Sequence, residues 1–131
     1  MANSSNVAAL FINDARTPVI SRVGYAHTWR RRLIGLLGHR ELGPDEGLWI
    51  RPCDSVHTIG MRFDIDVVFL DSQEKVVHIA ANLRRFRIAR ARAKSVLELP
   101  SGAAQRLGIH VGDQLRFRTA DERLHCGESL A

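Results

Sequence analysis

The chain has 131 residues, a net charge of +5 at neutral pH and a sequence pI of about 10.2. Its hydrophobic content of 45% and charged content of 25% are those of an ordinary globular protein and exclude an extensively disordered chain. No stretch approaches the run of about 20 apolar residues that spans a bilayer, and residues 1–16 do not have the pattern of a signal peptide. We therefore expect one soluble, cytoplasmic domain over residues 1–131, with its core at 7–118 and a flexible tail at 119–131.

The first half of the chain alternates between strand and helix patterns. Short apolar or alternating runs predict three strands, at residues 7–12, 19–26 and 48–51. Between the second and the third, apolar residues recur at helical spacing from Trp29 to Leu37, which predicts a short helix at 28–38.

The second half is richer in strands. Residues 65–71 are apolar on both faces, which is typical of a central strand covered on both sides. Further strands are predicted at residues 75–81 and 95–100, and residues 111–118 predict a Gly-Asp turn followed by a last strand. Ser101 and Gly108 are residue types that begin and end helices, so we expect a second short helix between them. Together these elements predict a mainly β fold, a compact antiparallel sandwich or barrel of about eight short strands with two short helices.

The densest group of reactive side chains lies in CDSVHTIGMRFDID, residues 53–66. Strand alternation places Asp66 on the same face as Val68 and Leu70, so its carboxylate should be partly buried and must be paired. In one interpretation Asp66 orients His57 as a general base. In the other, Asp66 is a structural acceptor that caps the turn between two strands. The sequence leaves both interpretations open.

Glu98 is the second notable acid, because it lies between two leucines in a strand pattern. It either faces solvent on a half-covered strand or joins Asp66 and His57 in one polar pocket. These three residues are the catalytic candidates, but the sequence names no reaction. Since no HxH, HExxH or paired-cysteine motif accompanies them, we expect no metal site and no cofactor.

The two cysteines, Cys53 and Cys126, are expected to be free thiols in a cytoplasmic chain. Cys53 lies four residues before His57, a spacing that would suit a nucleophile and a base only on a helix. Pro52 and the extended pattern argue against a helix, so we interpret Cys53 as a small buried hydrophobe.

Residues 82–94 form a basic loop or edge segment without a single acid. Its six cations surround one aromatic residue, Phe86, and are Arg84, Arg85, Arg87, Arg90, Arg92 and Lys94. Such a segment suits a solvated edge strand or a surface that follows phosphates. No glycine-rich phosphate loop or aromatic pair accompanies it, so the sequence disfavours nucleic acid as the partner.

Four segments together resemble the uncharacterised family known as domain of unknown function 192 (DUF192). They are RLIGLLGHREL (32–42), GLWIRPCDSVHTIGMRFDIDVVFLD (47–71), VLELPSG (96–102) and IHVGD (109–113). The resemblance covers about residues 10–118 and is closest to relatives with a His-Thr pair before the central strand. It implies a single β-rich domain of sandwich or barrel type and no activity. Relatives often have proline at the position of Asp64, which argues against a special role for that residue.

The preferred interpretation is a small binding module rather than an enzyme. Its pocket would take an unknown small polar ligand or a peptide segment and would be lined by Ser55, His57, Thr58, Met61, Asp66 and Glu98. The first alternative is a hydrolase-like enzyme that uses His57 and Asp66. The second is a basic accessory protein that binds RNA or another polyanion through its arginine-rich segment. The oligomeric state stays open.

Overall fold

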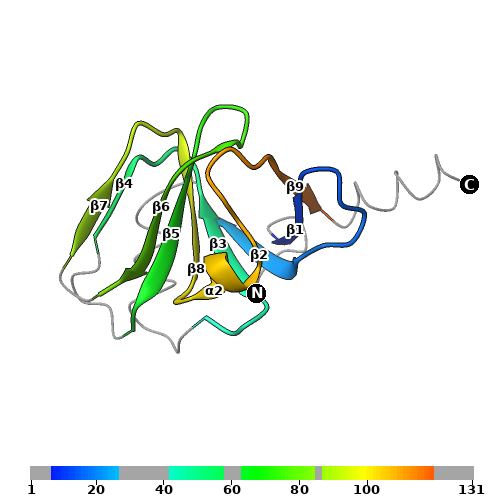
Figure 1. The fold of residues 1–131 in the computed structure, drawn as a ribbon, viewed down its shortest axis with the longest axis horizontal. Coiled ribbons are helices and arrows are strands. Elements are labelled where there is room, and N and C mark those ends of the chain that lie inside the picture. Colours follow the sequence, from blue (N-terminus) through cyan, green and yellow to red (C-terminus); the bar gives the residue numbers. More distant parts are fainter. Residues whose placement is uncertain (1–6, 27–41, 58–62, 85–86, 120–131) are drawn as a thin grey trace, which may run out of the picture.

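Strands make up most of the chain that the computed structural model describes, which is residues 7–26, 42–57, 63–84 and 87–119. The strands are β1 (Val7–Ile12), β2 (Ile20–Ala26), β3 (Glu46–Ile50), β4 (Ser55–His57), β5 (Ile65–Leu70), β6 (Val76–Leu83), β7 (Ile88–Arg90), β8 (Ser95–Pro100) and β9 (Leu115–Thr119). One short helix, α2 (Ala103–Arg106), lies between β8 and β9 (Figure 1). The predicted mainly β fold is therefore confirmed, while the helix predicted at 28–38 lies outside the described residues. No helix of these described segments is long and apolar enough to cross a membrane.

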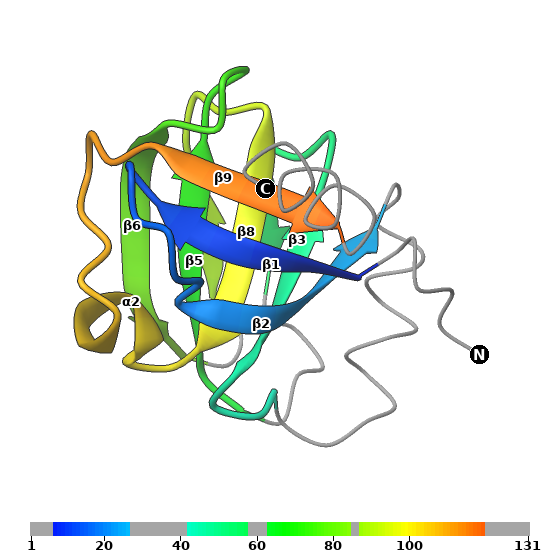
Figure 2. The same cartoon turned by 90° about the vertical axis from the view of Figure 1, so that its right-hand side faces the viewer.

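Seven of the strands form one sheet, in the order β6-β5-β8-β3-β2-β1-β9. Neighbouring strands are antiparallel except for β2 and β3, which run parallel. Figure 2 shows β9, β1 and β2 passing in front of β5, β6 and β8, so the sheet curls into a half-barrel. Its two edge strands meet at one corner, where Lys75 bridges to Gln114 and the Leu115 amide donates to the Glu74 carbonyl at 3.0 Å.

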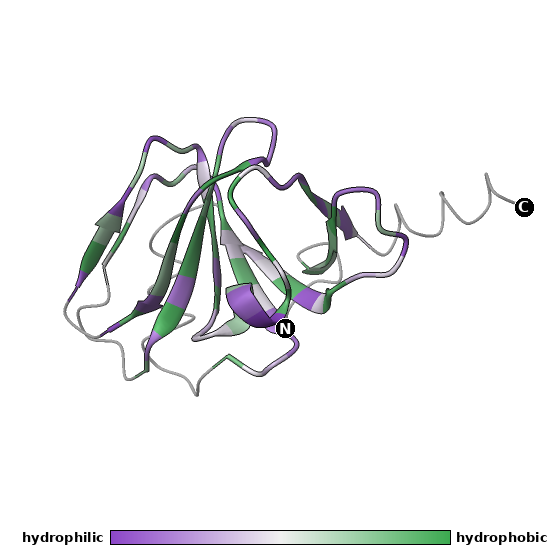
Figure 3. Ribbon diagram, in the orientation of Figure 1, coloured by the Kyte–Doolittle hydropathy of each residue, from purple (hydrophilic) through white to green (hydrophobic). Residues whose placement is uncertain are grey.

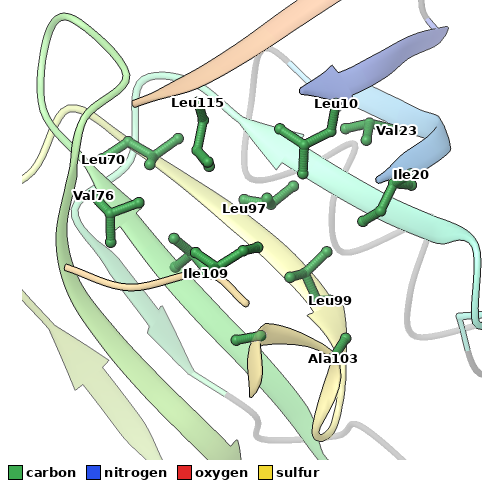
Figure 4. Close-up of a cluster of buried hydrophobic side chains, with 12 residues drawn as sticks. Leu10, Ile20, Val23, Leu70, Val76, Leu97, Leu99, Ala103, Ile109 and Leu115 are labelled. Atoms are coloured by element: carbon green, nitrogen blue, oxygen red, sulfur yellow. The ribbon is translucent and has the colours of Figure 1, made fainter. Parts of the chain in front are cut away.

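The concave side of the half-barrel holds the first apolar layer. It collects side chains from both ends of the sheet and from the helix (Figure 4). Its buried members are Leu10, Ile20, Val23, Val68, Leu70, Val76, Leu97, Leu99, Ala103, Ala104, Ile109 and Leu115. The helix contributes only its two alanines, because its polar residues Gln105 and Arg106 are exposed.

The convex side is covered by a second, two-stranded sheet, in which β4 and β7 pair antiparallel. Val56 of β4 is buried in a second apolar layer together with Phe63 and with residues of β3, β5 and β8, namely Ile50, Ile65, Val67, Phe69 and Val96. Figure 3 shows that apolar residues concentrate on the strands and hydrophilic ones on the connecting turns. Because both faces of the sheet are covered, every residue of β5 is buried, as its continuous apolar run predicts.

Gly47 marks the closest packing between β3 and β8. A Cβ atom built on Gly47 would lie 3.1 Å from Leu99 Cδ2 and 3.4 Å from both Leu97 Cδ1 and the Glu98 carbonyl oxygen. Gly24, on the neighbouring strand, would meet its nearest atom, Leu48 Cδ1, at an ordinary 3.4 Å. The two glycines therefore differ in how much space a methyl group would find.

We expect Gly47→Ala to lower the free energy of unfolding by about 1–3 kcal/mol, because the leucines of the concave layer must shift to accept the methyl group. Gly24→Ala should change it by less than about 1 kcal/mol. Urea unfolding followed by circular dichroism measures both values. Equal effects of the two substitutions would show that the packing at Gly47 is not the tight contact described.

Candidate functional site

Asp66 lies at the start of β5, fully buried, and its carboxylate accepts three backbone hydrogen bonds. Oδ1 receives the amides of Asn82 at 2.8 Å and Gly102 at 3.1 Å, and Oδ2 receives the amide of Ala104 at 2.9 Å. Three amide donors offset the cost of burying the carboxylate. Asp66 therefore joins β5, β6 and the start of α2 at one end of the half-barrel.

The backbone around Asp66 is shaped to supply these donors. Ile65 pairs with Leu83 and Val67 pairs with Ala80, so two residues of β6 bulge opposite Asp66. One of the two, Asn82, has a φ of 54° and turns its amide toward the carboxylate. On the other side, Gly102 precedes α2 with a φ of 87°, a conformation that glycine adopts readily.

The helix cap differs from the sequence prediction. Ser101 does not cap α2, whose N-cap residue is Gly102, and no side-chain hydrogen bond is made from that position. The Ser101 hydroxyl donates instead to Asn82 Oδ1, and Asp66 supplies the acceptor for the helix amides. The helix is also only one turn long, at Ala103–Arg106, and does not fill the stretch from Ser101 to Gly108 in which it was predicted.

Glu98 is also fully buried, so the interpretation in which it faces solvent is wrong. It lies directly opposite Val67 in the pairing of β5 with β8, whereas Asp66 lies opposite Leu99. Paired residues share a face and neighbours along a strand alternate, so Glu98 points to the convex layer and Asp66 to the concave one. The structure therefore does not bring these two carboxylates into one pocket.

Of the other predicted pocket residues, Ser55 and His57 lie in β4, on the convex side. Val56 of β4 packs into the convex layer, so this strand lies on the face of the sheet opposite Asp66. Ser55 and His57 flank Val56 in β4, while Thr58 and Met61 lie outside the described residues. Cys53 is half-buried against the convex layer and donates to the Ser55 carbonyl at 3.1 Å, which agrees with its interpretation as a buried hydrophobe.

The basic segment lies over the same convex side. Its described cations Arg84, Arg87, Arg90, Arg92 and Lys94 are all exposed, and Arg85 and Phe86 lie outside the described residues. Among the residues that the structure describes, no three His, Cys, Asp or Glu side chains come together in a group that could hold a metal ion.

A pocket that the sequence analysis missed opens at the end of the half-barrel away from Asp66. It has a volume of about 300 Å³ and is lined by Trp49, Arg51, Glu74, Gln114, Leu115, Arg116, Phe117 and Arg118. These residues come from the end of β3, the turn after β5 and the start of β9. The strands β3 and β9 are not neighbours in the sheet, so only its curvature brings them together.

Two stacked aromatic rings form the wall of this pocket. The rings of Trp49 and Phe117 lie 4.0 Å apart with an interplanar angle of 4°, and Tyr25 packs at a tilt against Trp49 at 5.0 Å. The Trp49 indole N–H donates to the Ser95 hydroxyl at 3.0 Å, which fixes the orientation of the ring. The stack spans the concave side of the half-barrel and so presents a rigid apolar surface.

Arginines give the pocket its charge. Arg51 lies 3.4 Å from Glu74 across the rim. Arg116 points away, because its guanidinium donates to the carbonyls of Asn13 at 2.8 Å and Ala15 at 2.6 Å and covers the ring of Phe11. Arg118, the remaining cation in the lining, is half-exposed and lies on the same face of β9 as Arg116, because side chains alternate along a strand.

The sequence holds a weak signal for this pocket. In the third strand Trp49 is followed by an arginine two positions later, and in the last strand Phe117 lies between Arg116 and Arg118. Both strands were predicted correctly. What sequence patterns cannot supply is the curling of the sheet that brings the two strands face to face.

Comparison with known proteins places this architecture in a family. A model of DUF192, described as "Uncharacterized ACR", matches residues 10–117. The chain belongs to the DUF192 family. A UPF0127 protein of Thermococcus sibiricus is 32% identical over 124 residues, which is 87% of this chain and 78% of the relative. A UPF0127 protein of Pyrococcus furiosus is 39% identical over 64 residues, 48% of this chain and 55% of the relative.

Two crystal structures share the DUF192 fold seen in this chain. A protein of unknown function from Novosphingobium aromaticivorans has a TM-score of 0.70 at 25% identity and covers 84% of each chain. A protein from Sinorhizobium meliloti, provisionally described as a transcription regulator, has a TM-score of 0.72 at 25% identity and covers 84% of this chain and 92% of its own. Neither description assigns a ligand.

The hydrogen bonds of Asp66 lead to a stability prediction. In Asp66→Asn, an amide nitrogen replaces one carboxylate oxygen, so at least one backbone N–H must face another donor. We expect the free energy of unfolding to fall by about 2 kcal/mol. The matched control is Asp64→Asn, two residues earlier at an exposed position, which should change it by less than about 0.5 kcal/mol. Thermal and urea unfolding check both values, and similar stabilities for the two variants would rule out the structural role of Asp66.

Proposed function

We propose that this chain is a ligand-binding module and that its binding site is the pocket beside the Trp49–Phe117 stack. The observation that carries the proposal is the stack itself, which joins two strands that are not neighbours in the sheet and leaves arginines at the mouth of the pocket. Binding pockets combine apolar walls with convergent polar groups, and this one joins the aromatic stack and Leu115 to five charged or polar side chains.

The class of ligand follows from the aromatic and the arginine side chains that line the pocket. The aromatic surface favours a flat apolar body, and Arg118 together with Arg51 favours an anionic group, since a guanidinium forms paired hydrogen bonds with a carboxylate. A volume of about 300 Å³ is at the small end of ligand pockets. We therefore propose a small molecule, or a single terminal side chain of a peptide, that carries a carboxylate on a planar apolar group.

The hydrolase-like alternative has less support. It requires His57 and Asp66 to act together in an open cleft. Asp66 is fully buried, its carboxylate already receives three amides, and β4 packs on the opposite face of the sheet. The pocket predicted from Ser55, His57 and Glu98 would have to form on the convex side without Asp66.

A pair of probe molecules tests the proposed site. 2-Naphthoate has the flat apolar body and the carboxylate, and 2-naphthamide is its neutral analogue. In two-dimensional ¹H–¹⁵N spectra of the whole chain, 2-naphthoate should shift the Trp49 indole signal and the amides of Arg51 and Phe117. Arg118→Gln should weaken its binding about tenfold, because it removes one charged hydrogen-bond partner.

The control variant is Arg22→Gln, an exposed arginine of β2 that does not line the pocket. It should leave the affinity for 2-naphthoate unchanged, and Arg118→Gln should not alter the weaker binding of 2-naphthamide. Shifts confined to the β4–β7 side, or an equal loss of affinity in both variants, would contradict the proposed site.

A further inference from the structure

Exposed and half-buried residues alternate along the segment 88–94, which is not part of the pocket. Ala89, Ala91 and Ala93 pack inward against the convex apolar layer. The alternate residues of the segment point outward and are exposed, namely Ile88, Arg90, Arg92 and Lys94. Small inward side chains hold an extended chain flat on the protein, so three successive cations project on one side of it.

Backbone hydrogen bonds fix this extended segment along its length. Residues 88–90 pair with β4, and the Ala91 amide donates to the Asp54 carbonyl at 3.1 Å. At the far end, the Lys94 amide donates to the Leu70 carbonyl at 2.8 Å, and the Lys94 carbonyl accepts the Cys53 amide at 2.9 Å. We call residues 88–94 the basic ribbon.

Further cations lie beside the basic ribbon. Arg84 and Arg87, which precede it, are also exposed, and Asp54 contacts it through its backbone carbonyl, which accepts the Ala91 amide. Only Ile88–Arg90 is a regular strand, and the chain bends at Arg92 and Lys94, so the three cations share one exposed side of the ribbon without the fixed spacing of a strand.

We propose that the basic ribbon binds the sugar–phosphate backbone of single-stranded nucleic acid. A row of exposed cations suits a linear polyanion, and arginine forms paired hydrogen bonds with phosphate. The exposed side chain of Ile88, 69% accessible, offers an apolar contact for a base or sugar next to the cations. A membrane surface would instead favour several apolar side chains that insert between lipids, and the described ribbon has one.

The test uses the full chain and a fluorescein-labelled dT₁₂ oligonucleotide, with binding followed by anisotropy. The ribbon variant is Arg90→Gln, Arg92→Gln and Lys94→Gln together. The control variant is Arg16→Gln, Arg22→Gln and Lys75→Gln together, three exposed cations away from the ribbon. Both variants carry the same net charge, so an effect of total charge alone would appear equally in both.

We expect the ribbon variant to bind at least tenfold more weakly than the wild-type protein and the control variant to bind within about twofold of it. With about three phosphates contacted, the logarithm of the wild-type affinity should fall with the logarithm of salt concentration with a slope of about −2. Equal weakening in both variants, or no binding by the wild-type protein at low salt, would overturn the proposal. Tighter binding to poly-glutamate or to phosphatidylserine vesicles than to dT₁₂ would also overturn it and assign the ribbon to another partner.

Discussion

The fold depends on one buried carboxylate that organises three separate segments. α2 is a single turn of four residues without a side-chain cap of its own, and an isolated helix of that length is not stable. Asp66 supplies the acceptor for the amides at its start and also holds the bulge of β6 at Asn82. This interaction places Ala103 and Ala104 against the concave layer and closes one end of the half-barrel. The far end, where Glu74 and Leu115 are joined, is where the pocket opens.

The sheet separates two kinds of surface. Its concave side contains the apolar layer, the aromatic stack and the pocket with arginines at its rim. Its convex side contains Glu98, the β4–β7 sheet and the basic ribbon. The two acids that the sequence suggested as partners therefore belong to different layers. The two proposed binding surfaces, the pocket and the basic ribbon, likewise lie on opposite sides of the sheet.

Local patterns were sufficient to predict most strands. The apolar run of β5, the alternation in β2 and the turn before β9 identified elements that the structure contains, and the burial of β5 on both faces followed from its composition. The family resemblance, carried by four quoted segments, is confirmed by the match over residues 10–117. Both successes rest on information contained within short stretches of chain.

The failures all concern contacts between distant segments. Ser101 is a residue type that often caps helices. The contact at the start of the helix is made instead by Asp66, 36 residues before Gly102, whose carboxylate accepts the Gly102 amide. One of the two interpretations of Glu98 placed it in solvent, because the pattern of β8 cannot show that a second sheet covers its face. The Trp49–Phe117 pocket was missed because it exists only once the sheet has curled. The sequence pattern predicts which segments form strands, but it does not predict how the sheet curves or which layer covers each of its faces.

Amide hydrogen exchange of the native protein tests the central role of Asp66 most directly, without a substitution that could disturb the fold. If the carboxylate holds the three segments together, the amides of Asn82, Gly102 and Ala104 should exchange as slowly as that of Val68 in the buried central strand. The amide of Ser72 in the exposed hairpin turn provides the fast reference. Exchange of the three amides at the rate of Ser72 would contradict the account.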